Sequence, residues 1–208
     1  MATFKSSTFG KISGRYGDAL ATTSKATGKN YLRVASVPTN PRTEKQIVHR
    51  AKFGFSNSAL RAFYPIYKVT FGGNQGIRYA INRAFKEAIV GEYPNFTIDY
   101  TQLIFTEGAL YKTEVASVAK SDETNLIVEW DATILAGSHD NDLVNFILYN
   151  ENSNQALMMP NVAQRSEAST TITLPTIWKG ATIHCWMNFI TANKSINSDS
   201  QYIDSVTL

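Results

Sequence analysis

The chain has 208 residues, of which 43% are hydrophobic, a proportion that is ordinary for a globular protein and too high for a wholly disordered one. No stretch approaches the roughly 18–20 consecutive apolar residues that a transmembrane helix needs, which argues against a membrane span. The formal net charge of +3 conceals an asymmetry, because residues 1–54 hold ten Lys and Arg against two acids, and residues 55–208 hold ten against fifteen. A basic N-terminal segment attached to an acidic body could bind nucleic acid, and it could equally bind the acidic body of a neighbouring copy.

Residues 1–38 form a predicted N-terminal arm rich in Gly, Ser, Thr and Lys. Its first ten residues contain a lysine but no apolar segment after it, so no secretory signal is predicted. We therefore expect cytoplasmic synthesis, with a virion or a released assembly as the destination if another machine or lysis exports the product. Residues 19–24 and 29–34 predict two strands about a turn at Gly28. Because a lone hairpin is marginal in water, it must pack on the body, pair with another subunit or stay mobile.

Residues 39–92 form a predicted two-helix section. After Pro38-Thr-Asn-Pro41, a helix over about 43–63 is expected to end before Pro65; it starts either with Asn40 as cap and Pro41 at the first position, or with a Thr43–Gln46 capping box. A glycine-rich loop at 72–76 precedes the second helix. Its apolar residues, from Ile77 to Ile89, recur at i, i+3, i+4, i+7 and i+8, and Gly91 is expected to stop it.

Residues 93–208 form a predicted β-sandwich. Expected strands begin with 96–100 and 103–105, and seven more follow at 115–119, 125–132, 143–150, 155–159, 170–174, 182–190 and 201–206. Seven short strands separated by turns are typical of an immunoglobulin- or fibronectin III-like sandwich, with a jelly roll as the alternative. Leu126–Trp130 resembles the second strand of a fibronectin type III module, whose tryptophan packs in the core. The fold class predicted is therefore α+β, mainly β.

The sequence contains no recognisable catalytic or metal-binding pattern, so we expect that the protein is not an enzyme and holds no cofactor. There is no phosphate loop ending in Lys-Ser/Thr and no Gly-x-Ser-x-Gly elbow. The loop Ser138–Asp142 could offer oxygens to calcium, but it lacks the spacing of an EF-hand, so a polar turn is the simpler interpretation and His139 has no catalytic partner beyond it. Cys185 lies in an apolar run, where a buried structural thiol is expected. Scattered His and Cys residues predict no zinc site.

Two sets of residues are candidates for contacts. The arm carries cations that could bind a neighbouring subunit or nucleic acid, with aromatic residues between them: Lys5, Lys11, Arg15, Lys25, Lys29 and Arg33. Of the three tryptophans, Trp130 and Trp186 lie in apolar strands and are expected in the core. Trp178, in the connection Pro175–Gly180, is the one expected to be exposed, and it is the candidate contact for a carbohydrate or surface ligand.

Several segments together resemble a known but uncharacterised family. They are Gly10–Gly17, Gly28–Arg33, Asn40–Gln46, Arg50–Phe53, Ala88–Tyr100 and Ile183–Cys185, which occur in this order and span nearly the whole chain. The combination resembles a family of about this length from Bacteroidetes-type bacteria and their mobile elements. That family has no assigned activity or catalytic residues that could be transferred to this chain. The Asn-Pro-x-Thr…Gln…Arg…Phe stretch also resembles segments of small phage and prophage virion proteins.

These observations predict a non-enzymatic structural or assembly subunit, or an adaptor, of a phage-like particle or an extracellular assembly. In this hypothesis the arm contacts neighbouring subunits by adding strands to them. Two alternatives stay open: a nucleic-acid-binding protein that uses residues 1–54, and a carbohydrate- or surface-binding module that uses Trp178 and the loop at 137–142.

Overall fold

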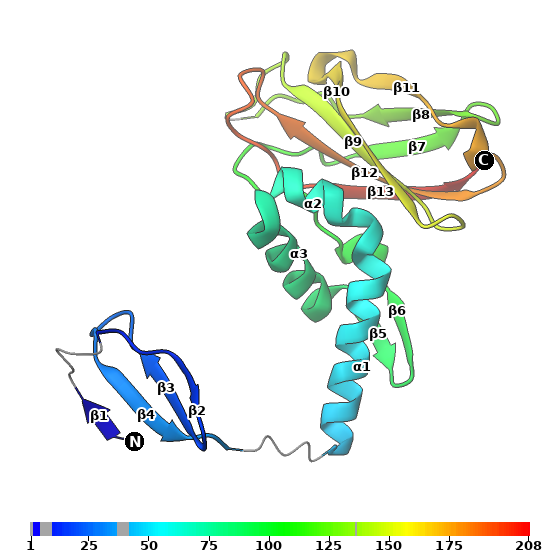
Figure 1. Cartoon of the computed structure of the whole chain (residues 1–208). Coiled ribbons are helices and arrows are strands. Elements are labelled where there is room, and N and C mark those ends of the chain that lie inside the picture. Colours follow the sequence, from blue (N-terminus) through cyan, green and yellow to red (C-terminus); the bar gives the residue numbers. More distant parts are fainter. Residues whose placement is uncertain (1, 5–9, 37–41, 136) are drawn as a thin grey trace. The chain divides into compact units, whose positions relative to one another are not determined.

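The computed structural model describes residues 2–4, 10–36, 42–135 and 137–208. The chain divides into two compact units, residues 1–43 and residues 44–208, which we call the N-terminal unit and the body (Figure 1). Lys5 and the expected helix cap at Asn40 and Pro41 lie outside the described residues.

The N-terminal unit contains a four-stranded antiparallel sheet. Its strands are β1 (Ala2–Phe4), β2 (Gly14–Tyr16), β3 (Ala19–Thr23) and β4 (Asn30–Val34), in the order β1-β4-β3-β2. The predicted hairpin is present as β3 and β4, and Gly28 in its turn has a φ of 64°, a conformation that favours glycine. Strands β1 and β2 have three residues each, which is too short for an alternating pattern to reveal them.

The helical part of the body contains both expected helices and a further short one between them. Helix α1 (Glu44–Ala59) continues through a 3₁₀ turn (Leu60–Phe63) into α2 (Tyr64–Thr70), and α3 (Gly73–Glu87) follows. Pro65 therefore begins a helix, where its missing N–H costs no hydrogen bond. Gln46 Oε1 has no hydrogen-bond partner in the structure, so the reciprocal half of the expected capping box is not formed.

Two further sequence predictions around the helices are corrected by the structure. Helix α3 begins at Gly73, four residues before the expected start, and Gly91 lies in a hairpin of β5 (Ile89–Glu92) and β6 (Asn95–Ile98) rather than at a helix end. A side chain at Gly91 would place its Cβ 2.5 Å from the carbonyl oxygen of Asn95, so the hairpin itself requires glycine. Residues 103–105 are not a strand; Leu103 and Phe105 are buried against the helices.

The remaining strands form the predicted sandwich of two antiparallel sheets (Figure 1). One sheet has the order β11-β8-β7, and its strands are β11 (Ser169–Thr173), β8 (Asn125–Trp130) and β7 (Ala116–Lys120). The other has the order β10-β9-β12-β13, and its strands are β10 (Gln155–Gln164), β9 (Leu143–Asn150), β12 (Thr182–Ile190) and β13 (Gln201–Thr207). Trp130 ends the second strand of the sandwich and is 5% exposed, as its pattern predicted.

The four-stranded sheet of the sandwich is covered on both faces. One face packs on the three-stranded sheet, with Phe146, Leu148 and Ile183 in the core between them. The other packs on the helices, where Phe63 of the 3₁₀ turn contacts the rings of Tyr149 and Trp186. This double burial explains why β9 and β12 are almost continuously apolar rather than alternating. Helices and sandwich therefore share a second core.

Candidate interaction surface

One face of the N-terminal sheet presents side chains to solvent, and we call it the open face. Cross-strand pairing places Arg15 of β2, Leu20 of β3 and Arg33 of β4 in one row, since Arg15 is opposite Leu20 and Leu20 is opposite Arg33. Thr22 and Tyr31 pair in the next row. Paired residues point to the same side of a sheet, so these five side chains share one face. Together with Ser24, four of them line a hollow of about 390 Å³: Leu20, Thr22, Tyr31 and Arg33.

The opposite face of the same sheet is covered in part by the unit's own chain. Asn30, which is 3% exposed, donates a hydrogen bond from Nδ2 to the carbonyl oxygen of Gly10 at 3.0 Å. The Thr23 hydroxyl lies 2.6 Å from Asn30 Oδ1 and 3.0 Å from the carbonyl oxygen of Ile12, whose N–H donates back to it at 3.1 Å. The segment 10–12 is thus held against one end of this face, whereas at its other end Tyr16 and Val34, which pair with Ala19, are 60% and 80% exposed.

The structure separates the predicted arm cations into groups. Arg15 and Arg33 lie on the open face, whereas Lys25 and Lys29 flank the β3–β4 turn and Lys11 lies in the segment that covers the other face. Within residues 10–36 these five cations face a single acid, Asp18, and the structure records no ion pair there. An unpaired cationic surface attracts an anionic partner.

Leu20 and Thr22 line the open face, and neither was singled out from the sequence. The signal that could have identified them is the alternation along the two strands. With a period of two, Leu20 and Thr22 share a face, as do Tyr31 and Arg33.

The predicted exposure of Trp178 is wrong. This residue ends a 3₁₀ turn (Thr176–Trp178), is 3% exposed, and donates a hydrogen bond from Nε1 to Gln155 Oε1 at 3.0 Å. Its ring belongs to the sandwich core, because the turn folds it inward and leaves its neighbour Ile177 outside, 77% exposed. A stacking platform for a sugar at Trp178 is therefore not supported.

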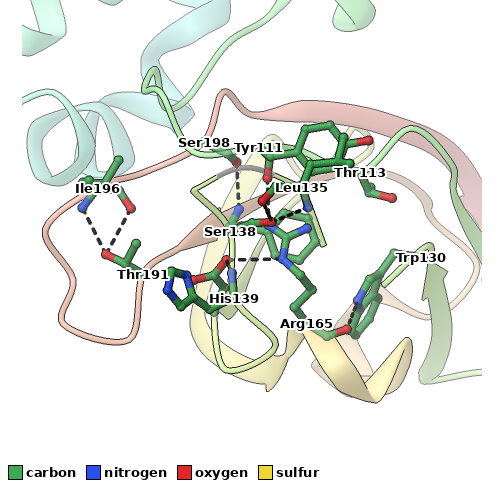
Figure 2. Close-up of polar contacts among 12 residues, drawn as sticks. Tyr111, Thr113, Trp130, Leu135, Ser138, His139, Arg165, Thr191, Ile196 and Ser198 are labelled. Atoms are coloured by element: carbon green, nitrogen blue, oxygen red, sulfur yellow. Dashed lines mark hydrogen bonds and ion pairs between the residues drawn. The ribbon is translucent and has the colours of Figure 1, made fainter. Parts of the chain in front are cut away.

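The loop at 137–142 is a structural turn tied to a buried ion pair (Figure 2). Asp142, 1% exposed, accepts hydrogen bonds from the His139 N–H at 2.9 Å and from Nε of Arg165 at 3.3 Å. The Asp142 carboxylate is thus buried in an ion pair inside the fold and is not presented on an exposed calcium-binding loop. Among the described residues, no group of three or more His, Cys, Asp or Glu side chains could hold a metal ion.

Arg165 is fully buried and connects several segments of the sandwich. Its Nη2 donates to the carbonyl oxygen of Tyr111 at 2.7 Å, and its guanidinium carbon lies 3.7 Å from the centre of the Phe189 ring (Figure 2). Trp130 Nε1 donates to the Arg165 carbonyl oxygen at 2.9 Å. Burial lowers the pKa of the Arg165 guanidinium, and the Asp142 carboxylate opposes that shift.

The buried titratable groups of β12 fit a structural role. Burial raises the pKa of the fully buried Cys185 thiol far above its usual range, so it stays protonated and unreactive, as expected from its apolar setting. His184 stacks on the ring of Tyr100 with centroids 3.9 Å apart, and its Nδ1 lies 3.0 Å from the Tyr202 hydroxyl. Burial lowers the pKa of His184 despite the Glu151 carboxylate 3.5 Å from Nε2, which acts in the opposite direction.

No helix in the described part of the chain is long and apolar enough to cross a membrane. No curated protein matches the sequence. A family model does match, over residues 11–204, and so covers the described β2–β4, all the helices and most of the sandwich. The chain therefore belongs to a family of unknown function, DUF6266.

Proposed function

We propose that this protein is a non-enzymatic assembly subunit whose N-terminal unit binds a neighbouring copy through the open face. The observation that carries the proposal is the open face itself: a hollow lined by Leu20 and Tyr31, with Arg15 and Arg33 at its sides. A natural protein rarely leaves such an apolar and cationic surface without a partner. The body of another copy offers opposite charge, because residues 44–208 hold sixteen acids against thirteen Lys and Arg, whereas residues 1–43 hold one acid against seven.

The test compares two full-length variants that change the net charge equally. Arg15→Glu/Arg33→Glu alters the open face, and Lys25→Glu/Lys29→Glu alters the turn beside it. Sedimentation equilibrium over a range of protein concentration should show that the wild type associates and that the open-face variant dissociates at least about tenfold more readily, since like charges across an interface cost several kcal/mol. The turn variant should lie much closer to the wild type. A wild type that stays monomeric at every concentration, or equal effects of both variants, would contradict the proposal.

Nucleic-acid binding is the second candidate, and one observation favours it. Arg15, Tyr31 and Arg33 lie on the same sheet face, so a base could stack on the ring while the guanidinium groups contact phosphates. This function requires affinity for single-stranded DNA or RNA that falls steeply between 50 and 200 mM salt, about fivefold per decade of salt for each phosphate contact. Absence of binding to an oligonucleotide at low salt would eliminate it.

A further inference from the structure

An aromatic groove of about 320 Å³ lies between α1 and α3 of the body. Helix α1 contributes residues spaced by four, which places them on one side of the helix: His49, Phe53 and Asn57. Helix α3 contributes Arg78, Ile81, Asn82 and Phe85. The Phe85 ring lies 5.3 Å from that of His49 and 6.4 Å from that of Phe53, centre to centre. Phe53 is 54% exposed, so the groove has an aromatic wall that is open to solvent.

The rim of this groove is cationic. Arg78 is exposed on α3, Lys52 Nζ lies 5.0 Å from the centre of the Phe85 ring, and Lys45 precedes His49 by one helical turn. Residues 44–87 as a whole contain eight Lys and Arg but two acids, Glu44 and Glu87, and Glu87 is paired with Arg83. An apolar floor with a basic rim fits an apolar segment that carries carboxylates.

One end of the sandwich has the complementary character, and we call it the acidic tip. It consists of Glu114, Val115, Asp131, Ile134 and Leu135. The two chain segments are joined, because the Asp131 N–H donates to the Val115 carbonyl oxygen at 3.0 Å and the Thr113 hydroxyl lies within 3.0 Å of the carbonyl oxygens of both. Val115, Ile134 and Leu135 are 66%, 52% and 47% exposed. Residues 88–208 hold fourteen acids against five Lys and Arg.

We propose that the groove between α1 and α3 of one copy binds the acidic tip of a second copy. The exposed Val115, Ile134 and Leu135 would cover the ring of Phe53, and Glu114 and Asp131 would meet Arg78 and the α1 lysines. Groove and tip are different surfaces, so the contact is head-to-tail and each added copy offers a new groove or a new tip. This inference rests on the proposed assembly function and adds a second contact to that of the N-terminal unit.

A second copy suits the groove better than nucleic acid does. The fourteen acids of residues 88–208 repel a polyanion, whereas the same acids are attracted to the groove of another copy. The groove floor is made of Phe53, Ile81 and Phe85, and burying it needs an apolar surface, which the acidic tip supplies and a phosphate backbone does not.

The experiment uses full-length variants on the two sides of the proposed contact. Arg78→Glu reverses the charge at the groove, with Lys68→Glu on the exposed side of α2 as its matched control. Glu114→Lys/Asp131→Lys reverses the tip, with Asp122→Lys/Glu123→Lys at the β7–β8 turn as its control. Groove and tip variants should each raise the dissociation constant for self-association at least about tenfold in sedimentation equilibrium, and the controls much less. Circular dichroism spectra that match the wild type verify the folding of all four.

Mixing the two variants tests the polarity of the contact. In an equimolar mixture, the intact groove of the tip variant can bind the intact tip of the groove variant, so one head-to-tail contact should form again between each pair and the mean mass should rise above that of either variant alone. No recovery on mixing, or an Arg78→Glu variant that behaves like Lys68→Glu, overturns the inference, and the proposed function still stands if Arg15→Glu/Arg33→Glu weakens association. If the groove and tip variants dissociate but Arg15→Glu/Arg33→Glu does not, the head-to-tail contact stands and the proposed role of the open face fails.

Discussion

The N-terminal unit and the body are stabilised to very different degrees by their own residues. Within residues 10–36 the buried side chains are Ala21 and Asn30, whereas the body has two apolar cores that share a sheet covered on both sides. A sheet with one short segment over one face buries little apolar surface, and that burial is the main source of folding free energy. We therefore expect the body to fold by itself, whereas the N-terminal unit leaves most of its described side chains at least partly exposed.

The two regions also differ in where their charged side chains lie. Among its described residues, the body buries one ion pair, between Asp142 and Arg165, and each of these two side chains forms a further hydrogen bond. The cations within residues 10–36 lie in solvent, Arg15 and Arg33 among them. Buried charged side chains therefore belong to the fold of the body, whereas the exposed charged side chains of the N-terminal unit belong to the proposed contact with a partner.

The largest effect is expected from breaking the buried ion pair. Arg165→Ala leaves the Asp142 carboxylate buried without its countercharge and removes the bond to the Tyr111 carbonyl, so the free energy of unfolding should fall by about 3–5 kcal/mol. Urea denaturation monitored by tryptophan fluorescence measures it. Lys179→Ala, which removes the exposed ion pair with Glu123, is the control and should cost less than about 1 kcal/mol. Similar losses for both variants would show that burial of the pair does not matter.

A smaller and local effect is expected in the N-terminal unit. Asn30→Ala removes the hydrogen bond to Gly10 and a partner of Thr23, so the local stability of the unit should fall by about 1–2 kcal/mol. Amide hydrogen exchange should show faster exchange in residues 10–34 and unchanged protection in β9 and β12. Lys25→Ala in the exposed turn is the control. If Asn30→Ala also reduced protection in the body, the two regions would not be independent in stability, and the comparison between them would fail.

The smallest effect concerns His184, where helices and sandwich meet. Burial lowers its pKa below the ordinary 6.5, so between these two values the unfolded chain binds a proton that the folded chain does not. Folding stability should therefore be fully present above pH 6.5 and decrease as the pH falls through that window. Urea midpoints at pH 7.5 and 5.5 measure the slope, which should be shallower for His184→Gln. A slope that His184→Gln leaves unaltered would contradict this account.

Local patterns were sufficient for much of the architecture. Strands β9 and β12 have the bounds predicted from their apolar runs, and the apolar stripe that starts at Ile77 predicted α3 apart from its first turn and its end, since Ile89 belongs to β5. The sites were harder. Arg15 and Arg33 were identified as cations, but their position in one row with Leu20 follows from the pairing of three strands. The partners Asp142 and Arg165 are 23 positions apart, so no local pattern indicates that they meet.

By itself, the sequence determined the longer helices and strands, the sandwich and the imbalance of charge, because these depend on periodicity, turn residues and composition, which are local or additive properties. The tertiary structure alone decided which residues are exposed. The Trp178 side chain is buried and that of its neighbour Ile177 is exposed. Asp142 is buried in a contact with Arg165, and Phe53 and Phe85 lie on two helices that together form a groove. The physical reason is that burial and partnership are set by contacts between segments distant in the chain, and each such contact depends on how the whole fold brings them together.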